Sequence, residues 1–340
     1  MLRDMVYWPA RFYQRYRPWL NRLPAAALLA WLFWATDQHI RAYPDEWRLF
    51  LTSVLALAGL YNLPIGYGLF IIALFYPLYT ISIYLAVLAL AFLVPPLFYM
   101  SDDIPAILLV LATPALVPYR LAPAVPALAG LLWGESLGTF VGVTAAWWLQ
   151  ILAAMAGLSP DLTQLGGHVW PWSFLIERFR QANSLQTLQW ALGPLAPDPR
   201  TFLRYILQVI GWGLAGYFVG LLHYRLRRSR PIWAALLPVP LLTALGLFLG
   251  YAALPMAFRL QPPGVIPWSG LVDGLAGGAA AAVVALVLHY LTGPVLARPR
   301  PIAMPEPSPP RAKPQPISVP RPRAHPEESP QDDIIMIDLD

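Results

Sequence analysis

The sequence predicts an all-α fold: a polytopic membrane helix bundle followed by a disordered C-terminal tail. Hydrophobic residues make up 58% of the 340 residues and charged residues 12%, whereas about a quarter of a soluble domain is charged. Several apolar runs approach the roughly 20 residues that a helix needs to cross a bilayer. Glycine recurs at every fourth position in two of these runs, which is typical of tightly packed membrane helices.

The N-terminal segment 1–23 combines arginine with tyrosine, tryptophan and phenylalanine, as expected of a cytoplasmic segment in the headgroup region. The apolar residues 24–36 are interpreted as the first span of the bundle. A cleaved signal peptide is the competing interpretation, but no small-x-small cleavage site follows. The acidic loop 37–47 is expected to be external.

Further spans are predicted at 48–62 and, as a pair, within 63–96. The run 104–128 contains five prolines, and because interior proline disrupts a helix, we expect a broken, re-entrant segment there. A continuous glycine-rich helix is expected over 129–157. The last predicted spans are 201–224, 232–258 and 266–291. The bundle, residues 24–292, would then hold about eight spans, or about ten if 104–119 and 122–134 each cross.

Between the spans, the polar loop 158–200 contains apolar residues at helical spacing and predicts an amphipathic helix on the external membrane surface. From residue 293 to 340 proline, arginine and acidic residues dominate, which predicts a disordered, proline-rich tail. Arginine clusters lie near both ends of the chain and at 225–230. The chain is therefore expected in the inner cell membrane as a multi-pass protein with both termini in the cytoplasm.

Glycines spaced by four residues leave one helix face without side-chain bulk, so that a neighbouring backbone can approach closely. We expect such glycines to be helix-packing positions. They form two series in the sequence: Gly130, Gly134, Gly138 and Gly142, and then Gly270, Gly274 and Gly278.

Three ionisable residues at membrane depth are candidates for a substrate pathway: Arg120, Glu135 and Asp273. Such groups are costly in a bilayer and usually face a cavity or a partner. Arg120 is expected to pair with Glu135 on one side of the membrane, with Asp273 in the opposite leaflet. The alternative is that both acids are hydrogen-bonded structural groups.

The sequence lacks residues that several kinds of metal, cofactor and nucleotide-binding site require. Cysteine is absent, the only lysine is Lys313, and the histidines are scattered without metal-ligand spacing, so no metal and no cofactor are expected. No phosphate-binding P-loop occurs, and the arginine clusters indicate membrane orientation rather than nucleic-acid binding. Gly134–Gly138 matches the G-x-S-x-G pattern, but a glycine-rich membrane helix explains the same glycines, and that motif requires a strand-turn-helix setting.

Two functions are therefore weighed, with an intramembrane hydrolase a distant third. The first is a transport or small-solute-binding component in the lipid bilayer, which lacks its own ATPase and would rely on an ion gradient, a partner ATPase or another membrane subunit. The second is a scaffold that recruits a cytoplasmic protein through its tail. A cavity lined by Arg120 and Glu135 would favour transport. The apolar residues proposed to bind the cytoplasmic partner are Ile334, Ile335, Met336, Ile337 and Leu339.

Overall fold

The computed structural model describes residues 2–226, 231–262 and 264–292. Every regular element in this part of the chain is helical, and no strand occurs among these residues. The predicted all-α fold is therefore confirmed for the described chain. The predicted tail, 293–340, and its proposed partner-binding tip lie outside the described residues.

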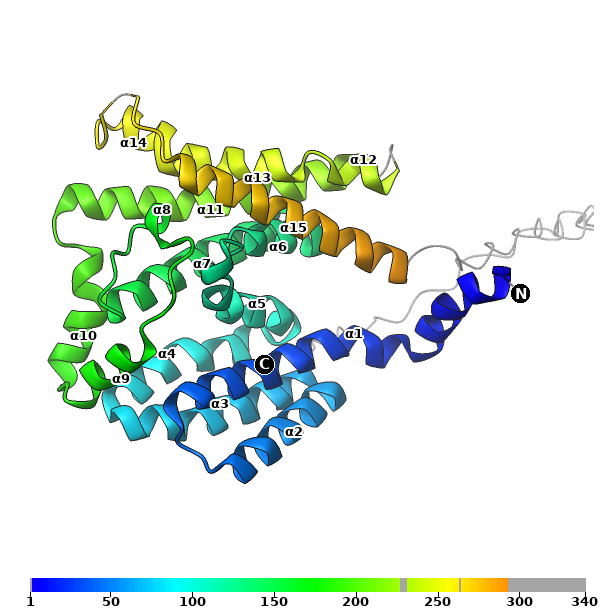
Figure 1. The fold of residues 1–340 in the computed structure, drawn as a ribbon, viewed down its shortest axis with the longest axis horizontal. Helices are drawn as coiled ribbons and strands as arrows, with labels where there is room; N and C mark the ends of the chain where they lie inside the picture. Colours follow the sequence, from blue (N-terminus) through cyan, green and yellow to red (C-terminus); the bar gives the residue numbers. More distant parts are fainter. Residues whose placement is uncertain (1, 227–230, 263, 293–340) are drawn as a thin grey trace, which may run out of the picture. The chain divides into compact units, whose positions relative to one another are not determined.

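The first four helices pack together at the N-terminal side of the bundle (Figure 1). A single helix, α1, includes both the arginine-rich segment 1–23 and the first predicted span. Phe33 and Tyr67 are fully buried between these helices, and the Tyr67 hydroxyl donates to the Leu93 carbonyl at 3.0 Å, which joins α3 to α4. The four helices are α1 (Leu2–Ile40), α2 (Asp45–Tyr61), α3 (Leu63–Ile81) and α4 (Ile83–Tyr99).

The middle of the chain reverses direction twice. After α5 (Ile104–Leu116) and a 3-10 turn (Val117–Tyr119), Arg120 has a positive φ of 59° and the chain turns into α6 (Ala124–Trp133). Gly134, with φ 87° and ψ −174°, then separates α6 from α7 (Glu135–Met155). The prediction of one continuous helix over 129–157 is therefore wrong. Only glycine adopts this backbone conformation without strain, so Gly134 is a hinge between two helices.

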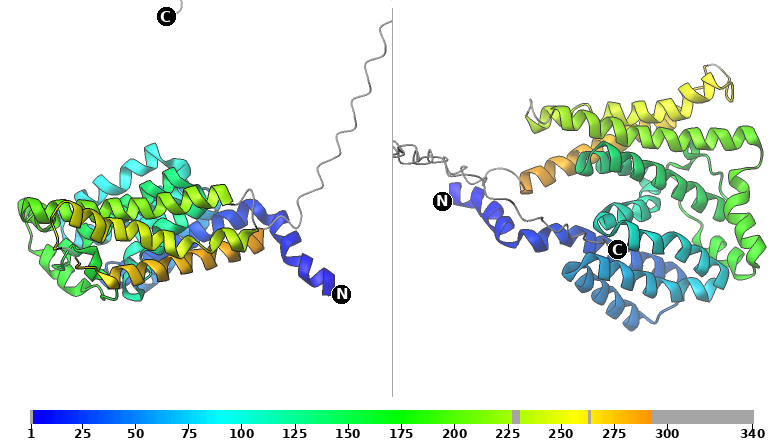
Figure 2. Two further views of the ribbon diagram at one scale, coloured as in Figure 1. Left: turned by 90° about the horizontal axis from the view of Figure 1, so that it is seen from above. Right: turned by 180° about the vertical axis from the view of Figure 1, so that it is seen from behind.

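The C-terminal helices lie side by side in both views of Figure 2. They are α11 (Pro199–Leu226), α12 (Ile232–Leu236), α13 (Val239–Phe248), a π-helical turn (Leu249–Ala253), α14 (Leu254–Ala257) and α15 (Trp268–Thr292). The π-helical turn inserts one wider turn between α13 and α14, and α11 and α15 both pack against α13.

The first glycine series brings three backbones together. A Cβ atom added at Gly138 would lie 2.7 Å from the Gly130 Cα and 3.0 Å from the Gly216 carbonyl oxygen. A Cβ at Gly142 would lie 2.4 Å from the Trp212 carbonyl oxygen. Because the chain folds back at the α6–α7 hinge, glycines that were expected on one helix face instead lie on two helices, and both helices contact α11.

The second glycine series lies along α15. A Cβ at Gly274 would lie 3.2 Å from the Ala244 Cα, and one at Gly278 would lie 2.6 Å from the Pro240 Cα. These positions leave room for the backbone of α13. Gly270 instead lies against the ring of Tyr251, 2.9 Å from where its Cβ would be.

The polar loop 158–200 forms three short helices, α8 (Leu162–Leu165), α9 (Trp172–Arg180) and α10 (Ser184–Leu192), at the end of the bundle where α7 finishes and α11 begins. We call this the α8–α10 end. Arg178 of α9 donates to the carbonyls of Ala154 and Met155 at 3.3 and 3.2 Å, which ties α9 to the last turn of α7. Burial lowers the pKa of the Arg178 guanidinium.

Six stretches of the described chain are long and apolar enough to cross a membrane, which supports an integral membrane protein. The predicted spans at 24–36 and 48–62 lie in helices that are not among them, and neither is the second span predicted within 63–96, because the apolar helix Ile83–Tyr99 is shorter. The stretch 101–119, expected to be part of a re-entrant segment, is among them, whereas Ala124–Trp133 is shorter. The six are 63–81, 101–119, 135–155, 199–226, 232–257 and 268–289, rather than the predicted set of about eight.

Candidate functional site

The break between α5 and α6 lies beneath the loop at the α8–α10 end. The Gly167 amide donates to the Val117 carbonyl at 2.8 Å, and Trp170 Nε1 donates to the Pro114 carbonyl at 2.7 Å. Each of these carbonyls also accepts a local backbone hydrogen bond, from the Val117 amide to Pro114 and from the Arg120 amide to Val117, so the loop adds a second donor to each. The two bonds from the loop hold it over the turn that carries Arg120.

Arg120 forms an ion pair with Asp273 of α15. The Arg120 NH1 atom lies 3.7 Å from the Asp273 Oδ1 atom, which is too long for a hydrogen bond. The Asp273 side chain is 9% exposed and the Arg120 side chain 56% exposed. Asp273 Oδ1 is buried and accepts no hydrogen bond. The pair thus joins a buried carboxylate with an unused acceptor to a guanidinium that is open to the surroundings.

The predicted pairing of Arg120 with Glu135 is wrong. Glu135 begins α7 at the opposite end of the bundle, where a Cβ atom added at Gly220 would lie 2.5 Å from the Glu135 backbone nitrogen. Its side chain makes no hydrogen bond or ion pair with any described residue. The error arose because α5 and its 3-10 turn form a long helical stretch, which carries Arg120 to the α8–α10 end rather than leaving it near Glu135.

A small cavity lies beside the ion pair, between the α5–α6 break, α7, α11, the π-helical turn and α15. Its volume is about 20 Å³, which is room for about one water molecule. Leu149, Trp212 and Tyr251 form the apolar and aromatic part of its wall. Arg120 and Asp273 supply its charged groups.

Two consecutive glycines of the loop make room for the charged side chains. A Cβ at Gly166 would lie 2.0 Å from Asp273 Oδ2 and 3.7 Å from Arg120 Cγ. Gly167 has φ 86°, and its Cβ would lie 3.2 Å from Arg120 Nε. Any side chain at Gly166 would therefore displace the carboxylate. The role of Gly166 and Gly167 was not predicted from the sequence, although adjacent glycines in a polar loop are a recognised turn signal.

The π-helical turn places Tyr251 in the wall of the cavity. Trp212 Nε1 donates to the Tyr251 hydroxyl at 2.6 Å, and both side chains are buried. The Tyr251 ring lies against Gly270, one turn before Asp273. π-helical turns are rare and often mark functional sites, and this one lies where α11 and α15 both approach the cavity.

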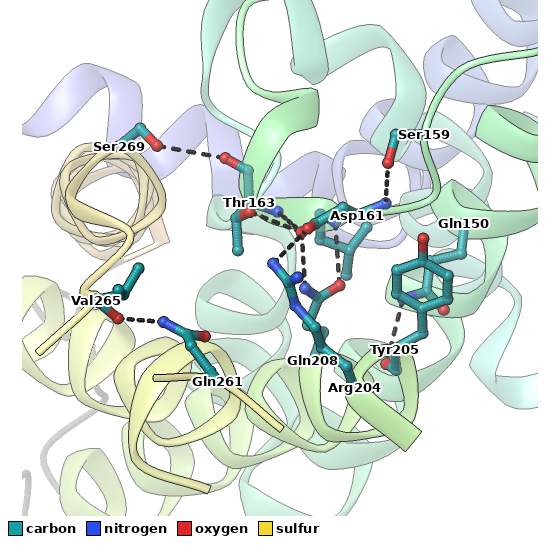
Figure 3. Close-up of polar contacts among 11 residues, drawn as sticks. Gln150, Ser159, Asp161, Thr163, Arg204, Tyr205, Gln208, Gln261, Val265 and Ser269 are labelled. Carbon is teal, nitrogen blue, oxygen red and sulfur yellow. Dashed lines mark hydrogen bonds and ion pairs between the residues drawn. The ribbon is translucent and has the colours of Figure 1, made fainter. Parts of the chain in front are cut away.

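Behind the glycine pair, a buried polar network holds the start of α8 on α11 (Figure 3). Asp161 Oδ1 accepts hydrogen bonds from the Thr163 amide at 3.0 Å, the Thr163 hydroxyl at 2.7 Å and Gln208 Nε2 at 2.7 Å. Its Oδ2 pairs with Arg204 at 2.6 Å, and Gln208 Oε1 accepts from the Leu162 amide at 3.1 Å. Both oxygens of this carboxylate are therefore occupied.

This network was missed at the sequence level, although two signals for it exist. Gln208 is an uncharged polar residue in the middle of an apolar span, where it needs a hydrogen-bonding partner. Asp161 follows Ser-Pro and precedes Thr163, a pattern typical of a side chain that caps a short turn. Neither signal identifies the partner, because Gln208 is 46 positions from Leu162 and 47 positions from Asp161 in the sequence.

The other predicted sites can be compared with the described chain directly. No group of three or more histidine, aspartate or glutamate side chains in this part could hold a metal ion. The G-x-S-x-G match lies at a helix-to-helix hinge, with Ser136 in the first turn of α7, and not at the strand-to-helix elbow that the hydrolase motif requires.

Comparison of the chain with protein-family models, with curated proteins and with solved structures finds no match. The functional argument therefore depends on the geometry of the cavity and its charged side chains.

Proposed function

We propose that this chain is a membrane component that binds or transports a small polar solute or ion, with Arg120 and Asp273 in the pathway. The observation that carries the proposal is the convergence of three irregular backbone segments on one cavity that holds an ion pair. These are the α5–α6 break, the π-helical turn and the Gly166–Gly167 segment. Ionisable groups in membrane spans mark pathways by default, and broken helices frequently form the substrate sites of transporters.

The energy source would lie outside this chain. The sequence contains no P-loop, so transport would be driven by an ion gradient, a partner ATPase or another membrane subunit. The arginine clusters favour cytoplasmic termini in the inner membrane, which would place the α8–α10 end outside. Reporter fusions at 225–230 and at 184–192 test this orientation: opposite sides are expected, with 225–230 in the cytoplasm.

The alternative, a scaffold that recruits a partner, depends on tail residues that lie outside the described chain. Deleting residues 332–340 tests it, because a scaffold would lose a co-purifying cytoplasmic protein while its bundle stays equally stable. The cavity is lined by Arg120 and Asp273 but not by Glu135, so the arrangement expected for transport is met in part. We take the charged cavity as support for the solute-binding function over a solid anchoring bundle. The hinge setting of Ser136 gives the hydrolase alternative no support.

Engineered cysteines provide the direct test of the cavity, because the natural chain contains none. Ala122→Cys places a thiol in the cavity wall. Ala129→Cys is the matched control. Ala129 lies further along the chain in α6, is 0% exposed and is not part of the cavity wall. Each variant would be reconstituted in lipid vesicles and treated with silver ions, which react with thiols and are close to sodium ions in size, and with larger cationic and anionic methanethiosulfonate reagents.

Faster modification of Ala122→Cys than of Ala129→Cys is expected, and the faster reagent would identify the charge that the cavity admits. Equal, slow modification of both thiols by silver ions as well as by the larger reagents would show that small ions do not reach the cavity. That result would overturn the proposed function.

A further inference from the structure

Asp161 and Asp273, two buried aspartates near the cavity, differ in one respect that bears on ligand binding. Asp161 has both oxygens occupied by donors from Thr163, Gln208 and Arg204. Asp273 has a buried Oδ1 atom without any hydrogen bond, and the residue lines the cavity. Buried polar atoms are usually paired. Several other buried atoms, among them Asp37 Oδ2, Gln150 Oε1 and Arg204 Nε, also lack a hydrogen bond in the described chain, but Asp273 lines the cavity and they do not, so a ligand that enters the cavity would meet the Asp273 oxygen.

The chemistry of the cavity restricts what this partner can be. A carboxylate oxygen accepts but does not donate, so the ligand must be a cation or a hydrogen-bond donor. An anion that captured Arg120 would leave the Asp273 carboxylate, 9% exposed, without a counter-charge, which is strongly unfavourable. The cavity volume of about 20 Å³ admits a species of about the size of one water molecule.

Arg120 is a tethered competitor for the same oxygen. Its NH1 atom faces Asp273 Oδ1 at 3.7 Å without a hydrogen bond, and its side chain is 56% exposed. It can therefore withdraw into the open side of the site while staying solvated. A small cation would then take the place of the guanidinium beside the carboxylate. The exchange leaves the net charge of the site unchanged, and this charge is one unit higher only while the guanidinium and the small cation are both present.

We infer that the cavity beside Asp273 binds one small monovalent cation, sodium or a proton, in exchange for the Arg120 guanidinium. This inference rests on the proposed function and identifies its coupling ion. In the proton case, a hydronium ion transfers its proton to Oδ1 and leaves as water, so that Asp273 becomes a neutral carboxylic acid. In the sodium case, the ion binds the carboxylate without any covalent change.

Few other charged or titratable groups face Asp273. Tyr251 approaches it from the π-helical turn, and the Asp161–Arg204 pair lies on the far side of the loop. Of the helices packed on α15, the helices α6, α8, α12 and α13 contain no charged residue, whereas α1 does. A cation effect that disappears with the Asp273 carboxylate can therefore be assigned to this site.

The test uses the full-length protein in detergent and follows its thermal unfolding by tryptophan fluorescence. One series replaces choline chloride by sodium chloride at constant ionic strength and constant pH. The other series varies pH without sodium. Each series is repeated on Asp273→Asn, Arg120→Gln and the control Asp102→Asn, whose carboxylate is exposed near the opposite end of α5.

For a sodium site, the unfolding midpoint of the natural protein and of Asp102→Asn rises with sodium and saturates, whereas Asp273→Asn shows no rise. For a proton site, sodium has no effect, and Asp273→Asn loses part of the pH dependence that Asp102→Asn keeps. In either case Arg120→Gln should bind the cation about tenfold more tightly, as expected for loss of one charge at roughly 4 Å. Gly166→Ala should abolish the effect, because its Cβ would occupy the position of Asp273 Oδ2.

Two results would overturn the inference: a cation response that is the same in Asp273→Asn and the natural protein, or no response to sodium or pH that depends on this carboxylate. The cysteine test of the cavity is independent. If Ala122→Cys is modified rapidly and no cation response is found, the solute pathway stands and only the cation site fails.

Discussion

Gly216 provides the sharpest test of how the bundle is held together. A Cβ atom at this position of α11 would lie 2.2 Å from the Gly138 carbonyl oxygen and 2.5 Å from its carbonyl carbon. Both are backbone atoms, so no side chain can rotate away to relieve the contact. Because ordinary contact begins near 3.4 Å, Gly216→Ala must move α7 and α11 apart by about 1.2 Å.

The cost of this separation can be bounded. Inserting one methyl group into a well-packed region typically destabilises a protein by about 1–3 kcal/mol. Replacing glycine by alanine inside a helix contributes about 1 kcal/mol in the opposite direction. Gly68→Ala in α3 is the matched control, since its Cβ would meet only a Leu97 methyl group, at 3.8 Å. It receives the propensity gain without the clash.

We therefore expect Gly216→Ala to be about 1–3 kcal/mol less stable than Gly68→Ala. The measurement is reversible unfolding in mixed detergent and denaturant, followed by tryptophan fluorescence, with gel filtration as the check on folding. Equal stability of the two variants would refute the conclusion that close backbone approach holds α6, α7 and α11 together.

Three further predictions use the same unfolding assay. Gly134→Ala should cost about 1–3 kcal/mol through backbone strain alone, because φ is 87° and no atom lies within 4 Å of the added Cβ; an unchanged stability would show that the hinge tolerates other residues. Gln208→Leu should cost about 1–3 kcal/mol, since it leaves a buried amide and the α8 carboxylate each short of a partner; a neutral effect would contradict that network. In double-mutant cycles, Arg120→Gln should couple with Asp273→Asn by about 0.5–1 kcal/mol, reduced by the exposure of the arginine. Arg120→Gln and Glu135→Gln should be additive within about 0.5 kcal/mol, and coupling between them would contradict the observed pairing.

The helical class and most of the segment positions could be predicted because they depend on local properties. Apolar length determines whether a stretch can cross a bilayer, and the described spans at 199–226, 232–257 and 268–289 lie close to the predicted ranges. The loop 158–200 contains the predicted amphipathic helix, divided into α9 and α10 by the turn at Asn183. Hydropathy carries enough information for these elements.

The hinge and the ion pair could not be predicted, for two physical reasons. Gly134 fits a packing series at spacing four as well as it fits a hinge, and only its φ of 87° distinguishes the two. Five prolines between 104 and 128 suggested a broken segment, but Pro114 stays inside α5 and Pro118 lies in the 3-10 turn, where a missing amide donor costs little. Because 101–119 was expected to be part of a re-entrant segment and not to cross the bundle, Arg120 was predicted at the wrong end of it.

The position of the unpaired carboxylate follows from how the bundle satisfies its helix ends. Where α5, α7 and α8 begin or end at the α8–α10 end, loop side chains add hydrogen bonds to backbone groups through Trp170, Arg178 and Asp161. Asp273 lies five residues inside α15, so it is not needed to cap that helix. The glycines at 166 and 167 keep other side chains away from it. Asp273 Oδ1 accepts no hydrogen bond from the described residues, and Gln150 Oε1 and Arg204 Nε are also buried without a partner. Asp273 lines the cavity and these two residues do not. Leaving its oxygen unpaired costs stability, and the cation that we propose would offset that cost.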